Sequence, residues 1–126
     1  MQKREKKILA VLDDLLFTVK INDAAKRSGM AVQFLKAEED VLEGAKQNPS
    51  LIILDLNCHS VQPLELISKL KSNPDFKQIS LIGYVSHVQG ELKQKAQEEG
   101  CDMVLARSAF SQNIQQILKR HSGAPL

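Results

Sequence analysis

Short apolar runs alternate along the chain with longer segments in which apolar residues recur every three or four positions. The runs are typical of buried strands, and the longer segments are typical of helices that cover a sheet. This repeated order predicts parallel strands joined by helical crossovers. The expected strands span residues 7–12, 31–35, 51–54, 80–85 and 103–106.

Each expected helix carries its apolar residues on one stripe, and turn residues mark its end. Ser28-Gly29 and Gly100 suit helix C-termini, where a left-handed residue is common. Asn48-Pro49 and Ser72-Asn73-Pro74 end two further helices, because the residue before a proline avoids the helical conformation. The predicted inward stripes are Phe17, Ile21, Ala24 and Ala25; Val41, Leu42 and Ala45; Leu64, Ile67 and Leu70; Val88, Leu92 and Ala96; and Phe110, Ile114, Ile117 and Leu118.

These elements predict the α/β fold class, with a doubly wound sheet of five parallel strands and helices on both faces. The domain is expected at 7–121, after a basic lead-in at 1–6 and before a short tail at 122–126. With 126 residues in the chain, we expect no second module.

Charge and cysteine usage argue against several classes of function. Seventeen basic and fifteen acidic residues leave a formal net charge of +2, too small for a nucleic-acid surface without a concentrated basic patch. Cys58 and Cys101 form no C-x-x-C pair and do not make a disulfide framework. No stretch approaches the roughly twenty apolar residues that a membrane span needs. We therefore expect a cytoplasmic protein that binds neither nucleic acid nor a membrane.

The third apolar run, from Leu51 to Leu54, ends abruptly in the carboxylate of Asp55. Residues that follow a strand of an open parallel sheet lie at its carboxyl edge, where ligands bind. A carboxylate there is partly desolvated, so it needs a cation, hydrogen-bond donors or a shifted pKa. Asp55 is therefore the first candidate for a functional role.

Other polar residues follow neighbouring strands and are expected at the same edge. Asp13 and Asp14 come after the first strand, Ser86 after the fourth and Arg107 after the fifth. Carboxylates from adjacent strands suit a hard cation such as Mg²⁺, which prefers oxygen ligands. A hydroxyl and a guanidinium would then bind the oxygens of a phosphoryl group on Asp55.

With these residues in place, the chain resembles the receiver domains of two-component response regulators, from Lys7 to about Arg120. Receivers have a flavodoxin-like sheet in the strand order 2-1-3-4-5, acidic residues after strand one and a phosphoaccepting aspartate after strand three. A threonine or serine follows strand four, and a lysine follows strand five. The segment from Gly100 to Ser108 resembles the family's strand-five signature, with arginine in place of the lysine.

The resemblance implies a role for each residue at this edge. Asp55 is the expected phosphoacceptor, and Ser86 and Arg107 stand at the hydroxyl and lysine positions. The expected ligands of Mg²⁺ are Asp13, Asp14, Asp55 and the backbone of Asn57.

The chain also departs from the receiver pattern. An ungapped reading puts Leu12 at the first acidic position and Asp13 at the second, whereas a strand one residue longer would make Asp13 and Asp14 the pair. Losing one carboxylate weakens a Mg²⁺ site, since a charge pair near 4 Å is worth roughly 4 kcal/mol at an effective dielectric constant of about 20. Arg107 differs from lysine in its planar fork, which suits an ion pair with unmodified Asp55.

Two further departures concern the surroundings of these residues. Cys58-His59 and Pro63 stand where receivers usually have a methionine-proline pair and then a glycine, and Val104 stands where an aromatic switch residue is common. Cys58, His59 and His87 also offer an alternative transition-metal site, which their irregular spacing disfavours.

The resemblance implies a stand-alone, CheY-like response regulator that is not an enzyme and that passes a phosphorelay signal by binding another protein. Its expected partners are a histidine kinase or phosphotransfer protein and an unidentified downstream protein, and a homodimer stays open. The alternative is a pseudo-receiver, an interaction module that is not phosphorylated. In that module an ion pair between Asp55 and Arg107 would lock one conformation.

Overall fold

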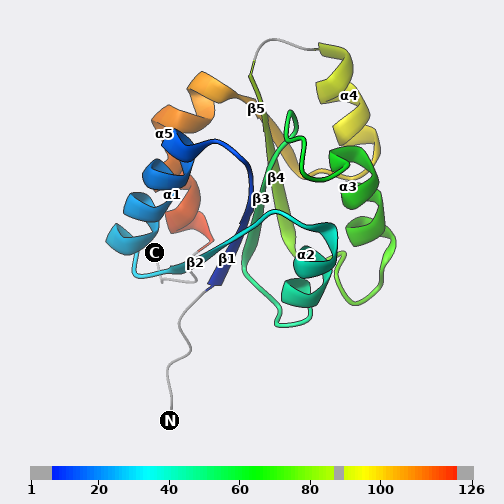
Figure 1. The fold of residues 1–126 in the computed structure, drawn as a ribbon, viewed down its shortest axis with the longest axis horizontal. Coiled ribbons are helices and arrows are strands. Elements are labelled where there is room, and N and C mark those ends of the chain that lie inside the picture. The colour runs from blue at the N-terminus through cyan, green and yellow to red at the C-terminus, as the bar shows by residue number, and fades with distance from the viewer. Residues whose placement is uncertain (1–6, 87–89, 122–126) are drawn as a thin grey trace.

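The computed structural model of the protein describes residues 7–86 and 90–121, in which strands and helices alternate (Figure 1). The expected lead-in at 1–6 and tail at 122–126 lie outside the described residues. The elements are β1 (Lys7–Val11), α1 (Leu15–Arg27), β2 (Ala31–Leu35), α2 (Glu38–Ala45), β3 (Leu51–Asp55), α3 (Pro63–Ser72), β4 (Ser80–Val85), α4 (Gly90–Glu98), β5 (Met103–Ala106) and α5 (Arg107–Arg120).

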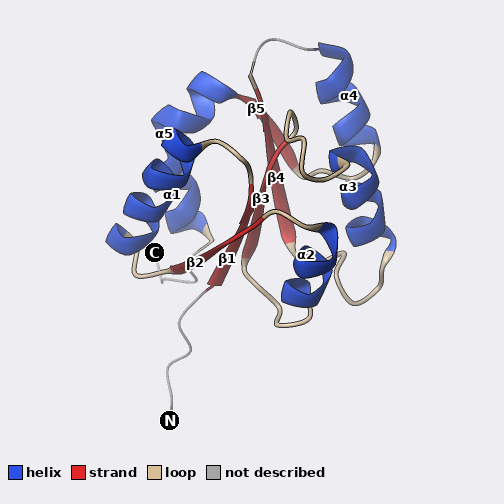
Figure 2. Ribbon diagram, viewed as in Figure 1, coloured by secondary structure: helices blue, strands red, loops and turns tan. Residues whose placement is uncertain are grey.

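In the described part of the chain, five parallel strands form one sheet in the order β2-β1-β3-β4-β5. The helices α1 and α5 cover one face, and α2, α3 and α4 cover the other (Figure 2). The predicted doubly wound fold and its strand order are confirmed. Because the winding reverses between β1 and β3, the loops after these strands diverge and leave room for a ligand at the carboxyl edge.

The central strand β3 is buried along its whole length. Ile52 and Leu54 pack in the core layer under α2, α3 and α4, whereas Leu51 and Ile53 pack in the layer under α1 and α5. This burial on both faces explains the continuous apolar run in the sequence. Asp55 continues the alternation of Leu51 and Ile53, so its side chain leaves the sheet on the face of α1 and α5.

The predicted second, fourth and fifth strands have the observed bounds, and small differences occur elsewhere. β1 ends at Val11, one residue earlier than predicted, and Leu12 is buried directly after it. In α3 the buried stripe includes Leu66, whereas the predicted Leu64 is only partly buried. The prediction for Val88 lies outside the described residues.

Glycines end two of the helices as the sequence predicted. Ser28 is the C-cap of α1, and Gly29 after it has a φ of 68°, in the left-handed region that glycine enters without steric cost. Gly100 follows α4 with a φ of 111°. None of the helices within 7–86 and 90–121 has the length and apolar character needed to cross a membrane.

Candidate functional site

Asp55 lies at the carboxyl end of the central strand and is only 9% exposed. Its Oδ1 accepts a hydrogen bond from the backbone N–H of Asn57 at 2.9 Å, while its Oδ2 accepts none from any described residue. Burial raises the pKa of Asp55 against the effect of that hydrogen bond, and the negative charge of Asp13 raises it further. Asp55 is thus a desolvated carboxylate, one oxygen of which is unengaged by the residues that the structure describes.

Asp13 connects the loop after β1 to the loop after β3. Its Oδ2 accepts hydrogen bonds from the thiol of Cys58 at 3.3 Å and from the backbone N–H of His59 at 3.2 Å. Desolvation acts to raise the pKa of Asp13, but the hydrogen bonds from Cys58, His59 and Ser60 together hold that pKa below its usual value. Asp13 is therefore ionised at neutral pH beside Asp55.

Both carboxylate oxygens of Asp14 bind partners on α1 and α5. Its Oδ1 caps α1 by accepting hydrogen bonds from the backbone N–H groups of Leu16 at 2.9 Å and Phe17 at 3.3 Å. Its Oδ2 forms an ion pair with the guanidinium of Arg107, the first residue of α5. Asp14 therefore joins α1 to α5, and both of its oxygens, which the sequence analysis expected to bind a metal, are engaged by these partners.

Arg107 is drawn toward α1 by two contacts. Besides the ion pair with Asp14, its guanidinium carbon lies 4.5 Å from the ring centre of Phe17. A planar guanidinium makes both contacts at once, because it stacks on a ring with its face and binds a carboxylate with its edge. The ion pair that the sequence suggested between Asp55 and Arg107 is thus replaced by one with Asp14.

Ser86 joins the loop after β4 to the loop after β3 through Asn57. The backbone N–H of Ser86 donates to Oδ1 of Asn57 at 2.8 Å, and its hydroxyl donates to the same oxygen at 3.0 Å. Since Asn57 also donates to Asp55, the three residues form one hydrogen-bonded chain at the edge of the sheet. Ser86 is therefore linked to Asp55 through Asn57, to which its hydroxyl donates a hydrogen bond.

Leu12 lies at the level of Asp55, because the last residue of β1, Val11, pairs with Leu54. It is 2% exposed and belongs to the core layer of α1 and α5. β1 ends at Val11 and does not extend to Asp13. An apolar side chain therefore lies at the level of Asp55, where the ungapped reading of the sequence expected the first acidic position.

The remaining oxygen groups suit a single Mg²⁺. Asp13 and Asp55 carry two carboxylates whose mutual repulsion raises the pKa of Asp55, and a divalent cation would relieve it. Two carboxylates and the backbone carbonyl of Asn57 are ligands of the type that Mg²⁺ takes, with its other positions left to water or phosphoryl oxygens. Larger metal-binding groups, with three or more His, Cys, Asp or Glu side chains, do not occur within the described residues.

The burial of Cys58 argues against the alternative transition-metal site. Cys58 is 6% exposed, and its thiol is hydrogen-bonded to Asp13 and Ser60. Burial raises the pKa of Cys58, which disfavours the thiolate that a metal binds. The third expected ligand, His87, lies outside the described residues.

Sequence reasoning missed Tyr84, which lies beside Asp55. The two residues are paired in register on β4 and β3, so their side chains leave the same face of the sheet. The ring of Tyr84 stacks on Phe17 and Phe110, with ring centres 5.0 Å and 4.8 Å apart. The signal was available: Tyr84 is two positions before Ser86 and is the single tyrosine of the chain.

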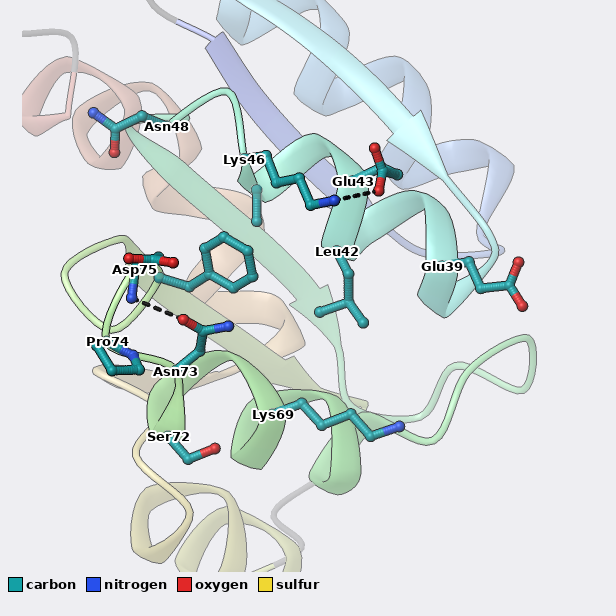
Figure 3. Close-up of a pocket in the computed structure, with 12 residues that line it drawn as sticks. Glu39, Leu42, Glu43, Lys46, Asn48, Lys69, Ser72, Asn73, Pro74 and Asp75 are labelled. Carbon is teal, nitrogen blue, oxygen red and sulfur yellow. Dashed lines mark hydrogen bonds and ion pairs between the residues drawn. The ribbon is translucent and has the colours of Figure 1, made fainter.

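A hollow of about 1200 Å³ opens away from these residues, between α2 and the segment from Lys69 to Phe76 (Figure 3). Leu42 and Phe76 line it, and Lys46 pairs with Glu43 at its rim at 2.7 Å. None of the residues proposed above for phosphoryl or metal binding lines this hollow.

Solved structures of response regulators share this fold over nearly the whole chain. The Mn²⁺-bound form of the response regulator Rcp1 is 20% identical, with a TM-score of 0.80 and coverage of 96% of this chain and 97% of that one. The phosphorylated cyanobacterial phytochrome response regulator RcpA is 23% identical, with a TM-score of 0.77 and coverage of 93% and 91%. The chemotaxis response regulator CheY4 of Vibrio cholerae is 18% identical, with a TM-score of 0.79 and coverage of 94% and 99%.

No protein-family model and no curated protein matches the chain. The likeness therefore lies in the architecture, which these structures share with the chain at low sequence identity. The resemblance that the sequence predicted is confirmed at that level: the chain has the fold of response regulator receiver domains.

Proposed function

We propose that the protein is a single-domain receiver of phosphorelay signalling and that Asp55 is its phosphoacceptor. The observation that carries the proposal is the state of Asp55, a carboxylate 9% exposed at the carboxyl edge, whose Oδ2 accepts no hydrogen bond from the described residues. In the transfer, the P–N or P–O bond of the donor breaks, and a P–O bond to Asp55 forms. The bonding electrons leave with the donor group.

The neighbouring residues supply positioning and charge. Asp13, Asp55 and the backbone carbonyl of Asn57 would hold Mg²⁺, which neutralises charge on phosphoryl oxygens when bound. Ser86 offers a hydroxyl that reaches a phosphoryl group by turning away from Asn57, to which its backbone N–H stays bonded. Two of the similar structures are a Mn²⁺-bound form and a phosphorylated form, which supports both parts of the proposal.

The phosphodonor is a protein, a histidine kinase or phosphotransfer protein, and it must dock where its phosphoryl group reaches Asp55. A surface at the first turns of α1 meets this condition, because α1 begins directly after Asp13 and Asp14. There Leu15, Leu16 and Val19 are 77%, 57% and 55% exposed, an unusual run of aliphatic side chains in water. We assign this surface to the phosphodonor.

Incubation with Mg²⁺ and acetyl phosphate, followed by intact-mass analysis, tests the phosphoacceptor. One added phosphoryl group is expected on the unaltered protein and on Asp75→Asn, in which an exposed carboxylate in the loop after α3 is lost. No addition is expected on Asp55→Asn. The same mass with and without acetyl phosphate, together with no binding of Mg²⁺, rejects the proposal.

A pseudo-receiver is the second candidate, and specific observations favour it. Leu12 replaces a carboxylate, and Arg107 is engaged by Asp14 and Phe17 away from Asp55. In this case the protein would bind its partner without phosphorylation. Partner binding that survives Asp55→Ala supports the pseudo-receiver, whereas signalling that is abolished by Asp55→Ala and kept by Asp55→Glu excludes it.

A further inference from the structure

Tyr84 carries a buried hydroxyl without a hydrogen-bond partner among the described residues. The residue is 1% exposed, so bulk water does not reach this hydroxyl. A buried hydroxyl that is left unpaired costs free energy, and native structures seldom retain one without a reason. The hydroxyl therefore marks a place where a hydrogen-bond acceptor is expected.

The acceptor is expected at the edge of the sheet, beside Asp55. Tyr84 and Asp55 are adjacent in register and leave the sheet on the same face. Burial raises the pKa of Tyr84, and the charges of Asp55, Cys58 and Asp13 raise it further, in that order. The hydroxyl thus stays protonated and lies within the field of these acidic groups, where it is a donor for a negatively charged acceptor.

The ring of Tyr84 belongs to a buried cluster of three aromatic rings, in which the ring centres of Phe17 and Phe110 are themselves 6.0 Å apart. Phe110 on α5 stacks almost parallel to it at an interplanar angle of 6°, and Phe17 on α1 lies at 28°. Phe17 in turn contacts the guanidinium of Arg107. A donor positioned by packing in a buried layer needs little reorganisation to bind an anion.

We propose that the Tyr84 hydroxyl donates a hydrogen bond to the phosphoryl group on Asp55 and that the stack with Phe17 and Phe110 passes this event to α1 and α5. The inference rests on the proposed function and names the residue that detects the modified site. Val104 occupies the position where an aromatic residue was expected from the receiver pattern, and it lies in the other core layer. Detection of the phosphoryl group is therefore assigned to Tyr84 on β4 and to the face of the sheet that α1 and α5 cover.

The chain itself provides the probe, because it has one tyrosine and no tryptophan. Its ultraviolet spectrum above the phenylalanine bands reports on Tyr84 alone. Titration with beryllofluoride in the presence of Mg²⁺ is expected to shift the tyrosine band to longer wavelength, as donation by a phenol does. Asp55→Asn is expected to show no shift.

Tyr84→Phe keeps the stacked ring and removes the donor. Its unmodified fold is expected to be at least as stable as the unaltered one, because the lost hydroxyl is unpaired. Its affinity for beryllofluoride, measured by calorimetry, is expected to fall by about tenfold, as for one hydrogen bond to a charged group. An unshifted tyrosine band, or equal affinity in Tyr84→Phe, overturns the inference while leaving phosphorylation of Asp55 intact. If neither beryllofluoride nor acetyl phosphate modifies the unaltered protein, the proposed function fails and the inference fails with it.

Discussion

Arg107 and Asp14 form an ion pair that joins the first residue of α5 to the N-cap of α1. The arrangement places the guanidinium beside Phe17, and within the described part of the chain Oδ2 of Asp55 accepts no hydrogen bond. The same carboxylate thus stabilises a helix end and keeps a cation away from the candidate phosphoacceptor. With Asp14 and Arg107 engaged by each other, the residues proposed to bind a metal or a phosphoryl group at the edge of the sheet are Asp13, Asp55, Asn57 and Ser86.

The two roles of Asp14 can be separated by substitution. Asp14→Ala removes the cap and the ion pair and is expected to lower the free energy of unfolding by about 1 to 2 kcal/mol. Asp14→Asn keeps a capping oxygen, and the ion pair is partly exposed to solvent, so a loss of about 0.5 kcal/mol is expected. Urea denaturation of both variants measures the difference, and equal losses contradict the cap as the main contribution.

The stability of the protein should depend on pH through Asp55. Because burial raises the pKa of Asp55, the folded state binds a proton more readily than the unfolded chain does. Its contribution is complete below the ordinary value of 3.8 and is lost as pH rises through the higher folded pKa. Asp55→Asn is therefore expected to be more stable than the unaltered protein at pH 7.

The advantage of Asp55→Asn should shrink as the pH approaches 3.8, the ordinary value for the group. Thermal unfolding from pH 7 down to pH 4 measures it, with Asp75→Asn as the control for removing one negative charge from the surface. An advantage that is constant with pH contradicts desolvation of Asp55 as the cause.

Leu12→Asp tests whether a missing carboxylate limits the metal site. Replacing this buried leucine is expected to cost about 3 kcal/mol of stability, as other losses of a core leucine do. The new carboxylate next to Asp13 and Asp55 should bind Mg²⁺ more tightly, so millimolar Mg²⁺ should raise the unfolding temperature more than it does in the unaltered protein. Leu12→Asn is the matched control, and an equal response to Mg²⁺ in both variants counts against the site.

The hydrogen bonds from Ser86 to Asn57 are unequal in their expected contributions. Ser86→Ala removes the hydroxyl but keeps the backbone N–H on Oδ1 of Asn57, so a loss of about 1 kcal/mol or less is expected. Asn57→Ala leaves that N–H without its acceptor, and a loss of about 1 to 3 kcal/mol is expected. Denaturant unfolding compares the two, and a larger loss in Ser86→Ala contradicts the assignment.

The fold was predictable because each element has its own period in the sequence. Burial on both faces makes β3 a continuous apolar run, and Gly29 and Gly100 end helices whose apolar stripes the spacing had already shown. The predictions that differ from the structure concern single residues at the ends or on the faces of elements. Leu12 continues the apolar run of β1 although the strand has ended at Val11, because the loop after it still faces the core.

The site was predictable only as a set of residues that follow strands. Which side chains bind one another depends on distances that the sequence does not contain. Arg107 pairs with Asp14 because α1 and α5 lie side by side on one face, and this choice needs the packing of both helices. Tyr84 was overlooked because its role depends on its register with Asp55 across two strands.

A crystal structure of the protein soaked with Mg²⁺ and beryllofluoride shows whether Asp55 is the phosphoacceptor. We expect density for beryllofluoride on Oδ2 of Asp55 and for Mg²⁺ between Asp55 and Asp13. Clear density for both carboxylates without beryllofluoride on Asp55, under conditions that modify a known receiver, would contradict that role of Asp55.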